Sequence, residues 1–296
     1  MSTPAEEERR RNIKAVLQVV AAAVLFSTGG AAVKTAAFSG VQVSSIRSGI
    51  AAVVLLLWLR GRVTWSGATM GVGAAYAATL TLFVAATKLT TAANAIFLQS
   101  TAPLYVALLA PFLLHERFKV RDAASLAAVA AGLWLCLAGS APASGTAPDP
   151  ATGNFLGVLS GAAWALTLTG LRWTERKDGG AISAVVAGNL IAFVAGVPAL
   201  LGLPSGTTAD WMVLGYLGVV QIGCAYILLT RAIAWLPALH VSLLLLLEPV
   251  LNPIWAWLAQ GERPGAAALA GGAVIVLASA FQAVSNARAS RPVPAA

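Results

Sequence analysis

The feature that most constrains this chain is a series of ten long apolar stretches separated by short segments that hold most of the charges. A helix of about 20 apolar residues crosses a hydrocarbon core of ~30 Å. Only 10% of the 296 residues are charged, against about 25% in a typical soluble domain. We therefore expect an all-α membrane protein with ten transmembrane helices. The expected spans are 13–33, 39–60, 67–88, 91–114, 119–139, 154–172, 181–203, 209–232, 236–259 and 264–286.

The positive charges indicate how the chain crosses the membrane. With a cytoplasmic N-terminus and ten spans, fifteen of the 19 Lys and Arg residues fall in inner segments. Lys34, Lys88 and Arg263 fall in outer segments, and Arg47 lies within a span. This is the positive-inside asymmetry of multi-pass membrane proteins. It predicts that both termini are cytoplasmic and that the net charge of +8 reflects topology. We expect the lipid bilayer as a partner, no nucleic acid, and no obligate protein partner.

A stretch rich in Pro, Gly, Ala and Ser divides the chain near its middle. Residues 140–153 contain no Lys or Arg and have the composition of a flexible linker, which we place on the periplasmic side. The expected organisation is a first five-helix repeat at 1–139, a second at 154–286 and a cytoplasmic tail at 287–296. Because the first repeat begins inside and the second begins outside, the second must be inverted.

The two halves share a motif in the fourth span of each. "TAANAIFLQSTAPLYVALLAPFLLHER" (91–117) aligns without gaps with "PALHVSLLLLLEPVLNPIWAWLAQGER" (237–263). Pro103 then falls on Pro249, and the closing Glu-Arg pair of one copy falls on that of the other. Inverted repeats with interrupted helices at corresponding positions are typical of secondary transporters, and they indicate a binding site near the membrane midplane.

These motifs resemble those of the drug/metabolite transporter superfamily. The five-plus-five layout, the Pro and Glu-Arg of each fourth span, and "FVAATKLTTAANAIFLQSTAPL" are similar to the EamA-type exporters. "IRSGIAAVVLLLWL", with Arg47 near its start, is similar to the second helix of that family. Within it, the chain most resembles the YddG-type amino-acid exporters. "LFSTGG" departs from the Trp-Gly pair of many relatives, so no role is carried over to that stretch.

The resemblance implies a function. Such a protein would be a secondary transporter with a substrate cavity between its halves. It would export small metabolites, such as aromatic or neutral amino acids, across a bacterial inner (plasma) membrane by alternating access. Export of other drugs or metabolites of the same superfamily is the alternative.

Glu248 is the most unusual residue of the apolar spans. It lies near mid-depth in "LLLLLEPVLNP", where a charge costs about 2.5–3.5 kcal/mol and therefore usually faces a cavity or a partner. It could bind a substrate ammonium group or carry a proton; alternatively, it could be a protonated or ion-paired structural group. The adjacent Pro249 and Pro253, like Pro103, remove backbone donors, and we expect the helices to bend there.

Arg47 lies at a similar depth, if its span enters from the outer side. It is a candidate for a structural ion pair with Glu248, in which removal of one member would leave the other stranded. The serines around it in "SSIRS" could satisfy it locally instead. In a third reading, its planar fork faces the cavity and binds a substrate carboxylate.

Five further polar or aromatic residues are candidates for substrate binding. His240, near the inner end of the span that holds Glu248, could hydrogen-bond substrate or take part in proton coupling, or simply bond a neighbouring helix. Trp164, midway through its span, could stack on a substrate or pack against small residues. Tyr76, Gln99 and Gln221 are deep enough to contact substrate, or they bridge helices.

The sequence lacks motifs of the competing classes. It has no G-x-x-x-x-G-K-[ST] loop and neither G-x-S-x-G nor H-E-x-x-H, so we expect no catalytic residues, no enzyme activity and no ATP-driven step. We expect no cofactor, and no metal, because no ligand set converges on His115 or His240. A channel or an intramembrane enzyme is the alternative of a different class. Proton exchange through Glu248 and His240 and facilitated diffusion are both compatible with the residues.

Overall fold

The computed structural model describes residues 4–115, 120–138 and 147–261, together with residues 266, 267, 270, 271, 273, 274, 277, 278 and 281. The first half contains α1 (Pro4–Ser27), α2 (Gly29–Thr35), α3 (Gly40–Trp58), α4 (Gly67–Leu89), α5 (Ala92–Gln99), α6 (Ala102–Leu114) and α7 (Val120–Ala138). The second half contains α8 (Pro150–Asp178), α9 (Ala181–Leu200), α10 (Thr208–Tyr216), the π-helix η1 (Leu217–Cys224), α11 (Ala225–Ile233), α12 (Ala238–Leu244) and α13 (Leu247–Gln260).

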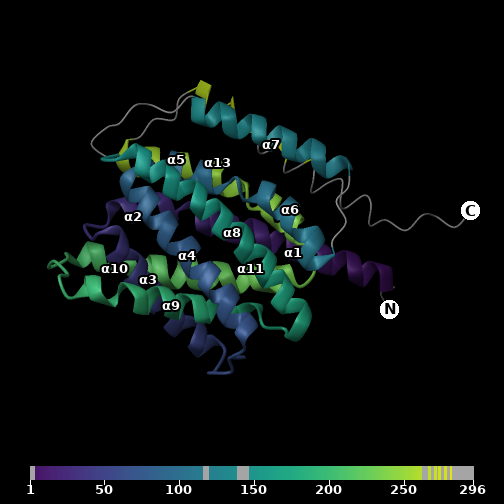
Figure 1. The fold of residues 1–296 in the computed structure, drawn as a ribbon, viewed down its shortest axis with the longest axis horizontal. Helices are drawn as coiled ribbons and strands as arrows, with labels where there is room; N and C mark the ends of the chain where they lie inside the picture. The colour runs from purple at the N-terminus through teal and green to yellow at the C-terminus, as the bar shows by residue number, and fades with distance from the viewer. Residues whose placement is uncertain are drawn as a thin grey trace, which may run out of the picture.

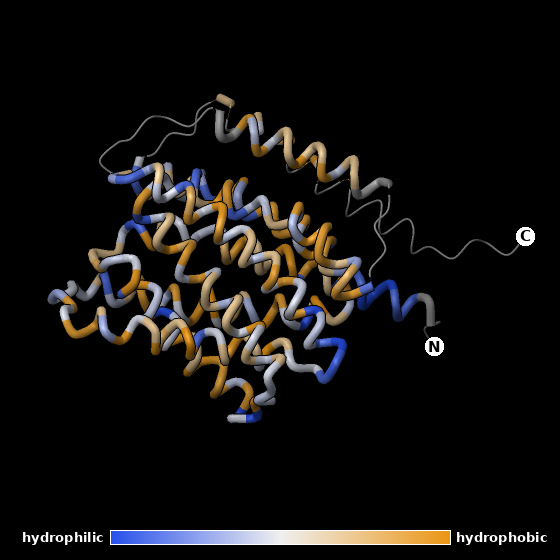
Figure 2. Tube along the Cα trace, in the orientation of Figure 1, coloured by the Kyte–Doolittle hydropathy of each residue, from blue (hydrophilic) through white to orange (hydrophobic). Residues whose placement is uncertain are grey.

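The regular secondary structure of the described residues is helical, with no strand among them, as expected. Eight helical segments are long and apolar enough to cross a membrane, and they correspond to eight of the ten expected spans. For the fifth span, the described part of α7 includes a shorter apolar helix, Ala123–Leu135. Most of the tenth span and all of the tail 287–296 lie outside the described residues, so ten helices remain a prediction. Many hydrophobic residues run along the helices, whereas hydrophilic residues gather at several helix ends (Figure 2).

The predicted linker 140–153 is too long at its C-terminal side. Residues 150–153 form the first turn of α8, because proline is well tolerated at the start of a helix and Asp149 caps it. The Asp149 carboxylate accepts a hydrogen bond from the Thr152 backbone N–H at 3.2 Å, and its bonding to Thr152 lowers the pKa of Asp149. Residues 139–146 of this region, and the Glu-Arg pairs at 116–117 and 262–263, lie outside the described residues.

The fourth span of each half is interrupted at the equivalent place. In the gapless alignment above, the starts of α5 and α12 coincide, as do the ends of α6 and α13. The residues that follow, His115 and Gly261, are both left-handed, with φ of 53° and 71°. The interruptions lie at Ser100–Thr101 and Leu245–Leu246, a few residues before Pro103 and Pro249. The two segments therefore share backbone conformation as well as sequence.

The packing of these interrupted helices shows their relative direction. α5 packs against α13, and α6 packs against α12, so the first part of each interrupted helix contacts the second part of the other. The two therefore lie antiparallel. Two further sets of contacts relate the halves in the same way. α8, the first helix of the second half, packs on α4, α5 and α6 of the first half. α1, the first helix of the first half, packs on α11, α12 and α13 of the second half. This pattern is what an inverted repeat requires.

The helices form layers around α4 and α8. Figure 1 shows these two helices in the middle, with α5, α6 and α13 above them and α3, α9 and α10 below. α7 lies at the upper edge, where it contacts α5. The centre of the molecule is therefore enclosed by helices of both halves.

Small residues allow α8 to approach the first half closely. A Cβ added at Gly153 would lie 2.7 Å from the Thr90 backbone nitrogen, and one added at Gly161 would lie 2.9 Å from the Leu98 carbonyl oxygen. The spacing of Gly153, Gly157 and Gly161 places all three on one face of α8, as in other small-residue helix contacts in membranes. This face packs against the interrupted helix α5–α6.

We predict that Gly153→Ala destabilises the protein by about 1–3 kcal/mol, because overpacking against backbone atoms cannot be relieved by a side-chain rotation. The matched control is Gly71→Ala in α4, where an added Cβ meets nothing within 4 Å; it should be neutral or slightly stabilising, since alanine favours helix. The midpoint of thermal unfolding in one detergent measures both. Equal midpoints for the two variants would contradict this packing.

Candidate functional site

A small cavity of about 30 Å³ lies among helices of both halves. Of the residues singled out from the sequence, five line it: Arg47, Gln99, Trp164, Gln221 and Glu248. The other lining residues are Phe26, Thr79, Leu80, Phe83, Ile222 and Tyr226. None of the eleven is more than 8% exposed, so the cavity is closed to solvent in this conformation.

One acidic and one basic side chain line this cavity without forming an ion pair. Glu248 (α13) and Arg47 (α3) both line it, but no ion pair within 4.0 Å joins them among the described residues. The Arg47 Nη2 donates to the Leu80 carbonyl at 3.4 Å, and its Nε has no partner in the described part of the chain. The candidate ion pair is thus not formed in this conformation. The neighbouring serines do not satisfy Arg47 either.

Glu248 owes its position to the interruption of its helix. It is the second residue of α13, and its backbone N–H donates to the Leu245 carbonyl at 2.9 Å. Its carboxylate accepts no hydrogen bond from the residues that the structure describes. A carboxylate and a guanidinium are both expensive to bury unless they are paired. The cavity therefore presents a cationic and an anionic group that are both available to a ligand.

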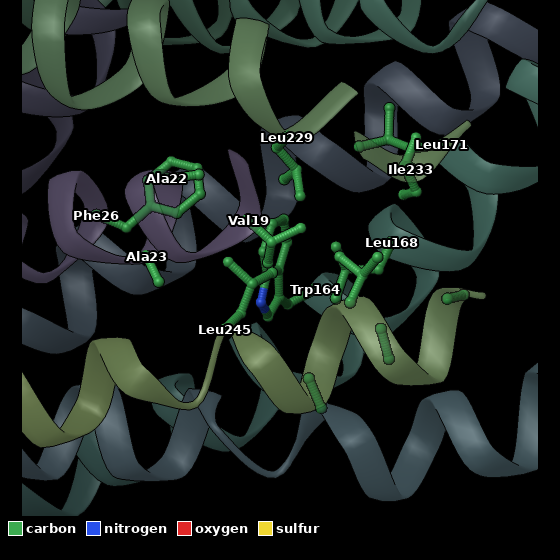
Figure 3. Packing of buried hydrophobic residues seen from close by; sticks show 14 of the residues in the cluster. Val19, Ala22, Ala23, Phe26, Trp164, Leu168, Leu171, Leu229, Ile233 and Leu245 are labelled. Atoms are coloured by element: carbon green, nitrogen blue, oxygen red, sulfur yellow. The ribbon is translucent and has the colours of Figure 1, made fainter. Parts of the chain in front are cut away.

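Aromatic rings form one wall of the cavity. The ring centroid of Tyr226 lies 4.9 Å from that of Phe26, 4.8 Å from that of Tyr76 and 6.3 Å from that of Trp164, all edge-on. Figure 3 shows Phe26 of α1 and Trp164 of α8 in the same apolar cluster as Leu245, at the α12–α13 interruption. Such a wall can contact an apolar or aromatic ligand.

Two amides complete the polar lining. The Gln99 Nε2 donates to Ser160 Oγ at 2.7 Å, so part of this amide is engaged in joining α5 to α8. Gln221 lies in the π-helix η1; its Nε2 is 3.5 Å from the Phe26 carbonyl, and its Oε1 has no partner among the described residues. π-Helical turns inside α-helices frequently occur at functional sites. Gln221 therefore offers the cavity an unused acceptor.

Tyr76 and His240 do not line this cavity. The Tyr76 hydroxyl accepts a hydrogen bond from Asn189 Nδ2 at 3.0 Å, which joins α4 to α9. Its ring supports Tyr226 from behind the aromatic wall. His240 precedes the interruption of its span, and it is partly buried in α12. Substrate contact by these two residues remains a prediction from the sequence.

Two residues of the cavity lining and one buried polar residue near Glu248 were not predicted from the sequence. Phe26 and Tyr226 line the cavity, but an aromatic residue in an apolar run has no signal that distinguishes cavity from core. Asn252, one turn after Glu248, is fully buried, and both polar atoms of its amide lack partners in the described chain. Asn252 follows Glu248 by four residues in "EPVLN", and residues four apart share a helix face. This spacing could have predicted that Asn252 lies on the same side of the helix as Glu248.

The glycine pair of "LFSTGG" accommodates two of these amides. An added Cβ at Gly29 would lie 2.7 Å from Gln221 Nε2, and one at Gly30 would lie 2.6 Å from Asn252 Nδ2. The pair stands at the junction of α1 and α2, next to Thr28. Glycine at these two positions leaves room for the side chains of Gln221 from η1 and Asn252 from α13.

Hydrogen bonds join helices on both sides of the cavity. At the end where α1 begins, Arg172 of α8 donates to the Ile233 carbonyl, and Arg176 donates to the Leu114 carbonyl at 2.8 Å. At the opposite end, the Trp255 indole donates to Ser27 Oγ and the Gln260 amide donates to the Ala31 carbonyl, each at 2.9 Å. Lys88 Nζ donates to the Ala36 carbonyl at 2.7 Å. These contacts join helices of different halves or of different spans.

The fold and the site together define a class: a multi-pass helical membrane protein with an enclosed, charge-bearing cavity between two internally related halves. Among the described residues, no group of three or more His, Cys, Asp or Glu side chains gathers. The sequence profile of the EamA-like transporter family matches residues 13–138 and again residues 151–283. The chain belongs to the EamA-like transporter family, within the drug/metabolite transporter superfamily.

A solved structure has the same fold. It is described only as "Crystal structure of protein", shares 22% sequence identity, and matches 94% of this chain and 99% of its own length with a TM-score of 0.69. No curated protein matches the sequence significantly. The family thus establishes a transporter with membrane-spanning helices.

We predict that Tyr76→Phe destabilises the protein by about 1 kcal/mol but leaves substrate affinity within twofold. The substitution removes a buried hydrogen-bond acceptor from a residue that does not line the cavity. Thermal unfolding and equilibrium substrate binding measure the two quantities. A large loss of affinity at unchanged stability would place the hydroxyl in the binding site.

Proposed function

We propose that this protein exports small zwitterionic metabolites, with aromatic and neutral amino acids as its substrate class. The observation that supports this proposal is the unpaired guanidinium of Arg47 and the unpaired carboxylate of Glu248 in one enclosed cavity. An amino acid carries a carboxylate that suits the Arg47 fork and an ammonium group that suits Glu248. Binding would therefore neutralise both buried charges together.

The other lining residues favour amino acids with apolar or aromatic side chains. Phe26, Trp164 and Tyr226 supply rings that can stack on such a side chain or contact an ammonium group. Gln99 and Gln221 supply amides for additional hydrogen bonds to the substrate. Other small metabolites of the superfamily that carry both charges are the second candidate substrates, since the same pair of groups would bind them.

We further propose that transport proceeds by alternating access. In this cycle, the contacts of Arg172 and Arg176 would close one end of the cavity, and those of Trp255, Gln260 and Lys88 would close the other. Breaking one set while keeping the other would open the cavity to one side only. A cavity closed at both ends supports a carrier rather than a continuous pore or an intramembrane enzyme.

The proposed location is a bacterial inner (plasma) membrane, with both termini cytoplasmic. This orientation rests on the excess of Lys and Arg in the segments assigned to the inner side. Glu248 is the group best placed for proton coupling, because it lines the cavity and bears no partner among the described residues. Facilitated diffusion needs no such group. A pH gradient distinguishes the two.

We predict saturable uptake of phenylalanine by proteoliposomes, stimulated by unlabelled amino acid on the opposite side. Such counterflow is the property of a carrier, whereas a channel gives linear flux without trans-stimulation. A panel of radiolabelled amino acids, with and without a pH gradient, identifies the substrate and the coupling. Linear, unsaturable flux would contradict the proposed mechanism.

We predict that the two charged residues recognise the two ends of the substrate separately. Arg47→Met should weaken phenylalanine binding about 10–100-fold, since a hydrogen bond to a charged group contributes about 1.5–3 kcal/mol. It should leave phenethylamine, which lacks the carboxylate, unchanged. Glu248→Gln should weaken phenylalanine similarly and leave 3-phenylpropionate, which lacks the ammonium group, unchanged.

The same three ligands are also measured on the wild-type protein. This comparison tests the proposal even if a variant does not fold. It should bind phenylalanine more tightly than either single-charge analogue. Equal affinity for all three ligands would show that the charges do not bind substrate. If Glu248→Gln changes neither the rate nor the pH dependence of transport, the carboxylate has no role in it.

A further inference from the structure

A second, smaller cavity of about 10 Å³ lies where the two interrupted helices meet. It is lined from one side by Ser100, Ala102 and Pro103, at the α5–α6 interruption, and from the other by Leu245 and Leu246, at the α12–α13 interruption. Helical interruptions within a membrane are tolerated where they are buried in protein or line a cavity. The described structure thus places free volume at the point where both halves are irregular.

This second cavity is lined by apolar side chains of both interrupted helices and by four polar side chains, Gln99, Ser100, Ser242 and Glu248. Ser100 Oγ donates to the Ile96 carbonyl at 2.6 Å, and Ser242 Oγ donates to the Leu239 carbonyl at 2.8 Å. Both hydroxyl protons are therefore engaged by the backbone of their own helices. The remaining polar side chains are Gln99 and Glu248, and both also line the first cavity.

The two cavities share a wall. Gln99, Trp164 and Glu248 line both of them, whereas Arg47 lines only the first. A ligand whose ammonium group lies at Glu248 therefore has its Cα at the boundary between the two spaces. From there, the carboxylate can extend toward Arg47 and the side chain can extend into the second cavity.

We propose that the second cavity is the side-chain subsite of the transporter, and that Ala102 sets the size of the side chain that it accepts. This inference rests on the proposed function. In this arrangement, the first cavity holds the charged end of an amino acid, and the second holds its apolar side chain. The rings of Phe26 and Tyr226 then cover the charged end.

At Ala102 the two halves carry side chains of different size and charge. It is 2% exposed and lines the second cavity, and it aligns with Glu248 of the other half. One half thus contributes a carboxylate to the wall, and the other contributes the smallest side chain with a Cβ. A larger residue at Ala102 would project into the second cavity and leave Arg47 and Glu248 in place.

The test is Ala102→Leu, assayed by equilibrium binding of alanine, leucine, phenylalanine and tryptophan. We expect the Kd for phenylalanine and tryptophan to rise about tenfold or more, as expected when a pocket is filled by several methylene-sized groups, and the Kd for alanine to stay within twofold. Ala107→Leu in the same helix, at a position that lines neither cavity, is the matched control and should leave all four unchanged.

Leu246→Ala tests the same subsite in the opposite direction and remains informative if Ala102→Leu does not fold. It should improve binding of tryptophan relative to alanine. An equal change for all four amino acids in both variants, or no change in either, would overturn the inference. Failure of the wild-type protein to bind any amino acid would instead overturn the proposed function.

Discussion

The need to satisfy every backbone polar group inside a bilayer governs this structure, because no water is available there to replace a lost helical hydrogen bond. Both halves nevertheless interrupt a helix in the middle of a span. In the first half, Ser100 and Thr101 satisfy carbonyls of the preceding turn through their hydroxyls. In the second half, where leucines stand instead, the backbone tightens and Glu248 N–H bonds to the Leu245 carbonyl. Glycines of α8 allow the first interruption to be covered closely, so the irregular backbone is sealed within the protein.

The sealed interruptions determine the chemistry of the centre. They place Glu248 at the start of a helix segment rather than in its interior, and they leave free volume beside it. Arg47 reaches the same space from a regular helix and does not pair with Glu248. A cavity with separated opposite charges, amides and rings recognises a ligand by its charge pattern and by the size of its apolar part.

Much of this arrangement could be predicted from the sequence, because apolar length and proline position are linear properties. The ends of α5–α6 and α12–α13 agree with a gapless alignment of the two segments, and five of the predicted residues line one cavity. What could not be predicted depends on rotation about helix axes. The positions of Arg47 and Glu248 within their spans predicted that both lie at the same depth in the membrane. These positions could not predict toward which neighbouring helix either side chain points. His240 precedes a helical interruption, so helical periodicity could not relate it to Glu248. Phe26 and Tyr226 have no sequence signal that separates them from ordinary core residues.

The π-helix of the second half distinguishes its third span from that of the first half. The span that contains it, Thr208–Ile233, is 26 residues long, whereas the corresponding span Gly67–Leu89 has 23. A π-helix closes its hydrogen bonds over one more residue than an α-helix does, so the side chains of η1 point in other directions than an unbroken α-helix would give them. Gln221 lies in this segment, and α-helix continues on both sides of it. One half of a two-repeat membrane protein can thus present a different side chain to the central cavity through a local change of helix geometry.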